Sequence, residues 1–545
     1  MPNQNLRPFI IGTRGSLLAL TQCGQVRQQL ESLSGRKFEL KIIKTQGDQL
    51  TGQALWQLPG KDFFTKELDD ALLGGQVDLV VHSLKDLGSE RPAGIKLQAI
   101  TKRQFSHDIL LIPEQHVATL CAKEWQGKFV VGTSSPRRIA NVTADLKKFL
   151  PHASQAADFQ VTTEILRGNV NTRIEKLRRG DFHAIVLALA GIERLSLDEK
   201  STQELLPLVR DLNFMILPRQ TFPSAAGQGA LGIECLEQAD QDLKNILIQM
   251  HCKNTATQVK HERKIFASYG GGCHLPLGIN ILQCDSGNEL VQSIKGSWQN
   301  SQYKKYALIR TSEIEKYQRN PNEMAFVGLA RMPQPSPDHY LCDQLFHKEA
   351  IEDVKSGHVL SGDVLVSTAY AIGALNDFKR QNRLTPQTFI WASGEKTHQK
   401  LAREGFWVNG TGDVNGEEDV NQFLSSKLLK LIKQQKGINP SLNTKYILSN
   451  AESSSQFGEI IPTYTRRWSD DLQKIESMHK ILQTINVFYW SSFAQYEIYC
   501  HNFPFIKTKR HCCGTGKTLK HFSQKNINVT AFTGVLEFCS WFEGE

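Results

Sequence analysis

The stretch from Val77 to Leu87, with the sequence VDLVVHSLKDL, constrains the fold more than any other part of the chain. Its apolar residues predict a strand buried on both faces, as in a parallel sheet covered by helices. The strand ends abruptly in Lys85 and Asp86. Because the carboxyl ends of strands in open α/β sheets border the ligand crevice, Asp86 is the first candidate for a catalytic carboxylate. The alternative is that Asp86 caps a helix or forms a surface ion pair.

The length of 545 residues exceeds what one hydrophobic core can organise and predicts roughly three or four domains. The composition is ordinary, with 40% hydrophobic and 22% charged residues. No apolar run reaches the ~18 residues of a membrane span, and the first residues lack a signal-peptide pattern, so we expect a cytoplasmic protein without membrane contact. Eleven cysteines without CxxC or Cys/His spacing predict reduced thiols and neither a disulfide framework nor a metal site.

The formal net charge of +9 is compatible with nucleic acid, a membrane surface or acidic small molecules as partners. The arginines occur singly or in pairs beside Gly, Ser and Thr at the ends of apolar runs, and not as a basic stripe interleaved with aromatic residues. This distribution favours small polyanions. A steep salt dependence of DNA affinity would support nucleic acid instead.

Two segments repeat one design, in which a strand runs into Gly-Thr, then a serine cap, then a helix. The first is FIIGTRGS, where Ser16 is the expected N-cap and Arg14 stands beside it. The second is FVVGTSSPRR, where Ser135 is the expected cap and Pro136 the first helical residue. Free N–H groups at such helix starts, together with arginine, can hold a carboxylate. The repetition predicts two similar domains that face one another.

Further candidates lie in loops. The segment LRGNVNTRIEKLRRG places Arg167 and Arg173 before or within a short helix. Lys61 precedes another helix and could reach a ligand, although a surface lysine is the alternative. Cys273 follows three glycines, Gly270 to Gly272. A lone cysteine is commonly a small buried hydrophobe, but a glycine loop favours a thiol that carries a group into a cleft.

The motifs GTRGS, VVHSLKDL, GTSSPRR, LRGNVNTR, GQGALGIE and GGCHLPLG occur in this order, and with them residues 7 to about 320 resemble hydroxymethylbilane synthase, also called porphobilinogen deaminase. The resemblance implies an α/β fold with two doubly wound domains like periplasmic binding proteins and a small α+β domain. The expected ranges are 1–105 with 224–248, 106–223, and 249–325. The resemblance also implies a dipyrromethane cofactor held through a thioether to Cys273.

The family joins four porphobilinogen molecules to the cofactor, releases ammonia each time and hydrolyses off the linear tetrapyrrole hydroxymethylbilane. Asp86 matches the catalytic aspartate, whose carboxyl group can help to expel ammonia, stabilise the cationic azafulvene and move protons. Arginine suits the acetate and propionate groups of each pyrrole because its planar fork pairs with carboxylates. The positions that match cofactor binding are Lys85, Thr133, Ser135, Arg137, Arg138, Gln228 and Gly229, and those that match substrate binding are Arg14, Ser16, Arg167 and Arg173. We expect a monomer.

Two positions depart from the family pattern. Gly88 stands where proline is usual, which suggests a looser turn after Asp86. Asp62-Phe63 replaces glycine-leucine, which puts the role of Lys61 in doubt. An anion-binding module with the same fold is the alternative to an enzyme, but such a module needs neither Cys273 nor Asp86.

The remaining sequence contains a repeat in which DVLVSTAYAIGAL and FIWASGEKTHQKL parallel NVFYWSSFAQYEIY and HCCGTGKTLKHF. Residues 340–545 therefore resemble a divergent uroporphyrinogen-III synthase, a two-lobed α/β region. The residues expected to offer hydroxyl and N–H donors to product carboxylates are Ser367, Gly394, Thr397, Ser491, Gly516 and Thr518.

Two alternatives compete for this region. GTGKT invites a phosphate-loop assignment, but His511 stands where that motif needs its first glycine. A non-catalytic appendage is the second alternative. With an active region, the full chain is expected to yield mainly the type III isomer, whereas a chain ending near Gln318 is expected to yield type I at a similar rate.

Overall fold

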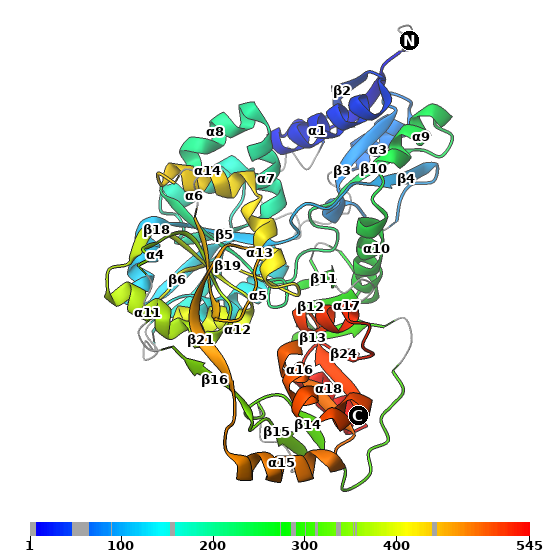
Figure 1. The fold of residues 1–545 in the computed structure, drawn as a ribbon. Helices are drawn as coiled ribbons and strands as arrows, with labels where there is room; N and C mark the ends of the chain where they lie inside the picture. Colours follow the sequence, from blue (N-terminus) through cyan, green and yellow to red (C-terminus); the bar gives the residue numbers. More distant parts are fainter. Residues whose placement is uncertain are drawn as a thin grey trace.

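The computed structural model describes residues 7–45, 65–88, 90–152, 158–272, 274–284, 290–299, 301–310, 314–333, 339–351, 354, 357–438 and 444–544. These residues form five sheets with helices packed around them (Figure 1). Among the helices in this part of the chain, none is both long and apolar enough to cross a membrane.

Sheet A has the strand order β2-β1-β3-β10-β4 and contains the strand that leads to Asp86. Its strands are β1 (Phe9–Thr13), β2 (Phe38–Ile42), β3 (Leu79–Ser83), β4 (Ile95–Ile100) and β10 (Leu231–Leu236), and its helices are α1 (Leu17–Ser34), α3 (Lys66–Leu73) and α9 (Gln241–Gln249). Strand β3 is buried and central, as its sequence predicts. The sheet is mixed and not parallel throughout, because β10 returns from the second sheet and pairs antiparallel with β3 and β4.

Sheet B repeats this plan with the order β7-β6-β8-β5-β9. Its strands are β5 (Asp108–Pro113), β6 (Lys128–Gly132), β7 (Gln160–Glu164), β8 (Ala184–Ala188) and β9 (Leu212–Ile216), and its helices are α4 (Glu114–Cys121), α5 (Pro136–Asp145), α6 (Val170–Arg178), α7 (Leu189–Leu197) and α8 (Glu199–Val209). Two connecting segments join the sheets: residues 101–107 lead from β4 to β5, and residues 217–230 lead from β9 back to β10.

A small antiparallel sheet C follows, with strands β11 (Leu277–Gln283), β12 (Leu290–Trp298) and β13 (Ser301–Ile309). Helix α10 (Lys253–Ser268) packs against β11 and connects this sheet with sheet A (Figure 1). The predicted cysteine loop therefore lies between α10 and β11.

The C-terminal region forms two further sheets. Sheet D has the order β15-β14-β22-β23-β24 and is parallel, with strands β14 (Ala325–Val327), β15 (Tyr340–Cys342), β22 (Val487–Trp490), β23 (Arg510–Gly514) and β24 (Thr530–Phe532). Sheet E has the order β16-β21-β20-β17-β18-β19, with strands β16 (Phe346–Ala350), β17 (Leu360–Val366), β18 (Leu384–Ala392), β19 (Val408–Thr411), β20 (Lys445–Asn450) and β21 (Glu459–Trp468). Sheet D begins before residue 340, because β14 precedes that residue and already pairs with β22.

Helices surround both C-terminal sheets. Those that follow strands of sheet E are α11 (Ile372–Arg380), α12 (Glu395–Arg403), α13 (Glu417–Leu424) and α14 (Lys427–Gln435), and those associated with sheet D are α15 (Leu472–Thr484), α16 (Phe493–Asn502), α17 (Lys517–Gln524) and α18 (Val535–Phe542). The chain enters sheet D, crosses to build sheet E, and returns to complete sheet D. This double crossing produces the two lobes that the sequence repeat predicts (Figure 1).

Sheets B and E share one hydrophobic core. Phe214 of β9 stacks on Phe389 of β18 with ring centroids 5.9 Å apart, and Trp391 lies beside them. Asn409 of β19 donates to the backbone oxygen of Phe214 and to the side chain of Asn213. These hydrogen bonds link sheet E to sheet B at the edge of the shared core. The deaminase-like and C-terminal regions therefore pack against each other through buried side chains and are not separate units joined only by a linker.

Candidate active site

Asp86 lies in a short 3₁₀ turn (Leu84–Asp86) directly after the central strand β3. Leu84 and Leu87 are buried and anchor the turn, while Lys85 and Asp86 are exposed. The strand therefore delivers the carboxylate to the sheet edge where ligands bind in open α/β folds. The structure places Asp86 within a turn and not at the cap of a helix.

Arg263 of α10 holds this turn in place. Its Nη1 donates to the backbone oxygens of Leu84 at 3.2 Å and Leu87 at 3.0 Å, and its Nη2 donates to that of Gly88 at 2.6 Å. A glycine in place of proline at position 88 thus has its carbonyl group tied to a helix from elsewhere in the chain. Sequence reasoning missed Arg263, because it lies about 180 residues from the turn and belongs to no motif.

Arg14 joins Asp86 in one small cavity. The lining residues are Arg14, Ala19, Gln22, Thr65, Leu68, Val81, His82, Ser83 and Asp86. Strands β1 and β3 are parallel neighbours, and the loops after both strands line this cavity. Ser16 caps α1 by accepting from the backbone N–H of Ala19 at 3.4 Å, which orients the loop that carries Arg14.

The second strand-turn-helix unit places Arg137 and Arg138 at the start of α5. Pro136 is the first helical residue and Ser135 is the cap position, but the Ser135 side chain makes no capping hydrogen bond. Instead, the backbone N–H of Ser135 donates to the hydroxyl group of Thr133 at 3.4 Å. The predicted cap is therefore correct in position and wrong in its side-chain bond.

Both arginines are buried against a carboxylate that the motifs do not include. Arg137 Nη1 lies 2.7 Å from Asp108 Oδ2, and Arg138 Nη2 lies 2.8 Å from Asp108 Oδ1. Although burial alone would raise it, the two guanidinium groups hold the pKa of Asp108 well below its usual range. Among the described residues, the Nε atoms of both arginines have no hydrogen-bond partner.

Further cations from both sheets act on the same site. The protein atoms around Lys85 disfavour its charged form and lower its pKa, with Arg138 and Arg137 acting in the same direction and Asp86 opposing them. Desolvation also lowers the pKa of Arg173 to about 10, with Arg138 and Arg167 contributing and Asp86 opposing. These couplings bring the predicted residues of sheet A and sheet B into one electrostatic environment.

Arg173 sits in the first turn of α6, where its Nε donates to the backbone oxygen of Gly168 at 2.7 Å. Asn169 caps the helix by accepting from the backbone N–H of Thr172 at 2.9 Å. Arg167 lies just before this cap. The helix cap and the bond to the glycine carbonyl group therefore fix the position of the Arg173 side chain at its Nε.

Gln228 and Gly229 hold the connecting segments together. Gln228 is buried, and its Nε2 donates to the backbone oxygen of Ser106 at 2.7 Å and to Asp108 Oδ1 at 3.0 Å. Gly229 has φ 90°, and a Cβ there would lie 2.6 Å from the backbone oxygen of Gln104. Gln228 therefore supports the carboxylate that holds the arginine pair, and Gly229 permits the close approach of the two connecting segments.

Two predicted site residues fall outside the described part of the chain. Cys273 lies between Gly272 and His274, which are described, and Gly270, Gly271 and Gly272 all have positive φ. Lys61 lies in residues 46–64, together with Asp62-Phe63.

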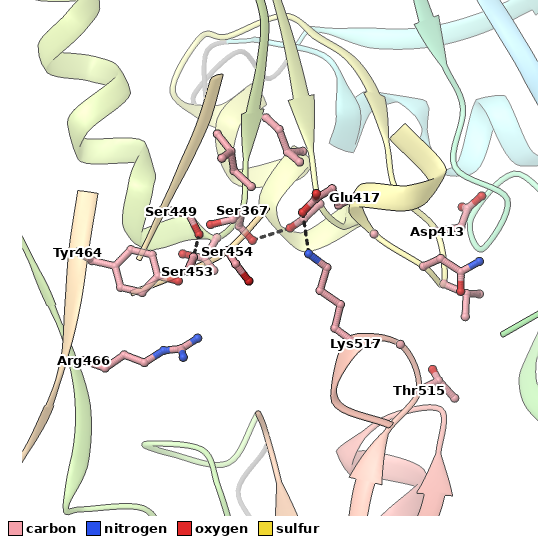
Figure 2. Close-up of a pocket in the computed structure, with 18 residues that line it drawn as sticks. Ser367, Asp413, Glu417, Ser449, Ser453, Ser454, Tyr464, Arg466, Thr515 and Lys517 are labelled. Carbon is pink, nitrogen blue, oxygen red and sulfur yellow. Dashed lines mark hydrogen bonds and ion pairs between the residues drawn. The ribbon is translucent and has the colours of Figure 1, made fainter. Parts of the chain in front are cut away.

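A second cavity, of about 320 Å³, lies between sheet E and the start of α17. We call it the C-terminal pocket. Its lining includes Ser367, Ser393 and Ser449 from sheet E and its loops, and Thr515, Gly516 and Lys517 from the other lobe. Figure 2 shows Lys517 extending to Glu417, with Nζ 2.7 Å from Oε2, and Arg466 on another side of the pocket. Hydroxyl groups, two cations and the carboxylate residues Asp413 and Glu417 thus line one pocket.

The predicted C-terminal residues are only partly assembled there. Ser367 and Gly516 line the pocket, whereas Gly394, Thr397, Ser491 and Thr518 do not. Thr397 is buried in α12, and the Ser491 hydroxyl donates to Gln495 Oε1 at 3.0 Å. Sequence reasoning missed Arg466 and Tyr464, which reach the pocket from β21 and carry no motif signal.

Comparison with known proteins identifies the first half of the chain. Residues 9–245 match the family model described as "Porphobilinogen deaminase, dipyromethane cofactor binding domain". A porphobilinogen deaminase of Nitratiruptor sp. is 39% identical over 286 residues, which cover 52% of this chain and 82% of that protein. One of Gloeobacter violaceus is 39% identical over 292 residues, covering 53% and 81%.

The chain is also similar to a solved uroporphyrinogen III synthase of Thermus thermophilus, at 12% identity and a TM-score of 0.27, with 41% of this chain and 100% of that chain covered. This likeness is too weak to support an argument about the C-terminal region. The deaminase relatives are far more similar and confirm the resemblance that the motifs indicate. The chain therefore belongs to the porphobilinogen deaminase family, and its activity is that of a hydroxymethylbilane synthase.

Proposed function

We propose that Asp86 is the catalytic carboxyl group of the hydroxymethylbilane synthase reaction. The observation that carries this proposal is an exposed carboxylate on the turn after β3, in a cavity with Arg14 and within the field of Arg173 and Lys85. In each condensation a C–N bond of porphobilinogen breaks as ammonia leaves, a C–C bond forms, and a proton leaves the attacked ring carbon. The Asp86 carboxylate can stabilise the resulting positive charge and accept that proton.

Cys273 is the proposed attachment point of the dipyrromethane. When bound, the dipyrromethane supplies the terminal pyrrole on which the chain is built. The residues of the site fit a group with several carboxylates, because Lys85 is exposed on the turn that carries Asp86 and lies within the electrostatic reach of Arg137 and Arg138. Thr133 and Ser135 stabilise the loop that presents these arginines, Gln228 supports the carboxylate that holds them, and Gly229 permits the close approach of the two connecting segments.

Arg14, Arg167 and Arg173 are proposed to bind the acetate and propionate groups of porphobilinogen and of the growing chain. Ser16 acts through the helix cap that positions Arg14. The arginines come from both sheets, so the substrate cleft lies between the units built on residues 1–105 with 224–248 and on residues 106–223. The unit of residues 249–325 supplies the cysteine loop.

Intact mass and turnover of three full-length proteins test these assignments. We expect wild type to be heavier than its sequence by one dipyrromethane, and Cys273→Ser to lack that mass. Asp86→Asn should keep the added mass and lose at least about 10²-fold in turnover, because shape is retained and the ionisable group is lost. Asp70→Asn, exposed on α3, is the matched control and should behave as wild type. Unmodified wild-type mass with full activity would overturn the cysteine assignment, and normal turnover of Asp86→Asn that of the aspartate.

A second function is proposed for the C-terminal pocket, namely closure of hydroxymethylbilane to uroporphyrinogen III. What supports it is the resemblance in residues 340–545 together with a pocket between two lobes that presents hydroxyl groups, Arg466 and Lys517. The test is the isomer that the full chain makes from porphobilinogen. We expect mainly type III from wild type and a shift towards type I from Arg466→Ala, with Lys520→Ala as the control because Lys520 pairs with Glu418 outside the pocket lining. Type I alone from wild type would leave the region as a non-catalytic appendage.

A further inference from the structure

A loop of the C-terminal region reaches into the deaminase half of the molecule. This loop, residues 412–417, leads from β19 to α13 and carries Asp413, whose side chain is only 1% exposed. One carboxylate oxygen of Asp413 accepts from His107 Nε2 at 2.9 Å and from Arg219 Nε at 2.7 Å. The other accepts from the backbone N–H of Arg219 at 2.7 Å. A single carboxylate from the far region thus takes three hydrogen bonds from the deaminase part.

Its partners lie in the two segments that connect sheet A to sheet B. His107 is the last residue of the segment 101–107, and Arg219 belongs to the segment 217–230. Arg219 also donates through Nη1 to the hydroxyl group of Ser106 at 3.1 Å, which ties the two segments to each other. Asp413 therefore lies where both connecting segments join sheet B.

The protonation states of these groups favour a fixed arrangement. Burial lowers the pKa of His107 to about 4, so at neutral pH its imidazole is uncharged and can donate one N–H to Asp413. Arg219 and His107 together lower the pKa of Asp413 to about 2 against the effect of burial, so the carboxylate remains charged. Asp419 fixes the backbone of the loop, because its Oδ2 accepts from the backbone N–H groups of Asp413 and Asn415, each at 2.9 Å.

The hydrogen bonds around Asp413 lie next in the chain to the residue that binds the arginine pair. His107 is followed by Asp108, which binds Arg137 and Arg138 and also accepts from Gln228 of the second connecting segment. A shift of His107 or Arg219 would therefore move the Asp108 carboxylate to which both arginines are bonded. Small displacements of this kind change rates strongly, because reacting groups must be held within a fraction of an ångström.

We propose that Asp413 is a positioning residue for the deaminase reaction, which holds the two connecting segments so that the arginines of sheet B face Asp86 of sheet A. The C-terminal region then contributes to the first activity whether or not it has one of its own. This inference rests on the proposed role of Asp86 and of the arginine pair, and its test separates the two.

The test compares full-length Asp413→Asn with Asn409→Ala. Asn409 is buried in the same interface, but it bonds to β9 and not to the connecting segments, so its variant measures the cost of a damaged interface alone. We expect both variants to melt at a lower temperature. For Asp413→Asn we expect the added mass of the cofactor, a KM within about twofold of wild type, a kcat lowered about tenfold, and partly elongated enzyme species in the mass spectrum. For Asn409→Ala we expect kcat within about twofold of wild type.

An unchanged kcat in Asp413→Asn, or an equal loss in Asn409→Ala, would overturn the inference. If Asp413→Asn does not fold, Arg219→Lys takes its place, since it keeps the charge and loses the second donor to Ser106; normal elongation by this variant would overturn the inference as well. Turnover of Asp86→Asn decides the underlying assignment independently. A dead Asp86→Asn beside a normal Asp413→Asn removes only the positioning role, whereas a normal Asp86→Asn removes the proposed catalytic residue.

Discussion

Asp108 shows how one carboxylate can determine what two neighbouring arginines do. Without it, two guanidinium groups would be buried side by side with no counter-charge, which is very costly in a protein interior. With it, the guanidinium group of each arginine is fixed in direction by an ion pair. The fold itself therefore holds the arginine pair in one orientation.

Replacing Asp108 by Asn should destabilise the protein by about 3–5 kcal/mol, because one partner of a buried ionic cluster is lost and the arginine charges remain. Urea unfolding at neutral pH measures this loss. Asp181→Asn is the control, since Asp181 pairs with Arg179 on the surface at 3.0 Å and should cost less than about 1 kcal/mol. Equal stability of the two variants would contradict a structural role for Asp108.

Glu395 gives the interface between the two regions a pH dependence. Desolvation raises its pKa from 4.5 to about 7, with Asp413 adding to the effect and hydrogen bonds from Thr221 opposing it. Because the folded-state pKa exceeds the unfolded one, this group favours folding below about pH 4.5 and loses that contribution as pH rises to about 7.

We therefore compare the free energy of unfolding of Glu395→Gln with that of wild type. The difference between them should shift in favour of Glu395→Gln by about 1–3 kcal/mol between pH 5 and pH 8. Unfolding by urea at both pH values gives the difference. Glu404→Gln is the control because Glu404 lies exposed directly after the same helix. Parallel pH profiles for Glu395→Gln and wild type would show that the carboxyl group is not desolvated in solution.

At the level of secondary structure, the turn after β3 depends on helix α10. Arg263 bonds to three carbonyl groups of that turn, and the chain that follows α10 contains Cys273. The turn that carries Asp86 and the cysteine loop are thus both attached to the C-terminal half of one helix. Movement of α10 would displace both together.

Arg263→Lys should lower turnover about tenfold, because the compact ammonium group lacks the planar fork by which Nη1 and Nη2 reach these carbonyl groups together, and the Asp86 turn loosens. Cofactor content by mass and kcat for the purified protein check this expectation. Lys264→Ala, on the exposed neighbour in α10, should leave both unchanged. Full activity of Arg263→Lys would mean that the turn is stable without this clamp.

Local signals predicted much of these elements, and long-range pairing accounts for the rest. The starts of α1 and α5 are encoded by Ser16 and by Ser135-Pro136 within a few residues, and the burial of β3 follows from its apolar run. The antiparallel entry of β10 beside β3 could not be read in this way, because its partner strand lies about 150 residues away. Asp108, Arg263 and Asp413 were missed for the same reason: each is defined by a distant partner and not by its neighbours.

For the molecule as a whole, the shared core of sheets B and E means that the two regions stabilise each other. The sequence suggested that a chain ending near Gln318 would work at a similar rate. The structure argues against that expectation, because such a chain would expose Phe214 and Ile216 and leave the connecting segments without Asp413. We expect the shortened chain to bind hydrophobic dyes and to melt at a lower temperature than the full chain.

Trp391→Ala tests this mutual support in the intact chain. Loss of this buried side chain should cost about 3–5 kcal/mol, and because the core is continuous the loss should appear in sheet B as well as in sheet E. Hydrogen exchange of the backbone amides in β5 and β9 reports on sheet B directly. Leu472→Ala, at a site 79% exposed, is the control. Unaltered exchange in β5 and β9 would mean that the two regions unfold independently.

The same continuous core has a consequence for how the protein is made. Synthesis runs from the N-terminus, so β5 and β9 leave the ribosome well before the strands of sheet E that cover them. During that interval the nascent chain carries an apolar surface with no partner, which invites aggregation or capture by a chaperone. Slower translation between β9 and β18 would lengthen this exposure. The yield of active enzyme in a cell should then depend on codon usage in that interval.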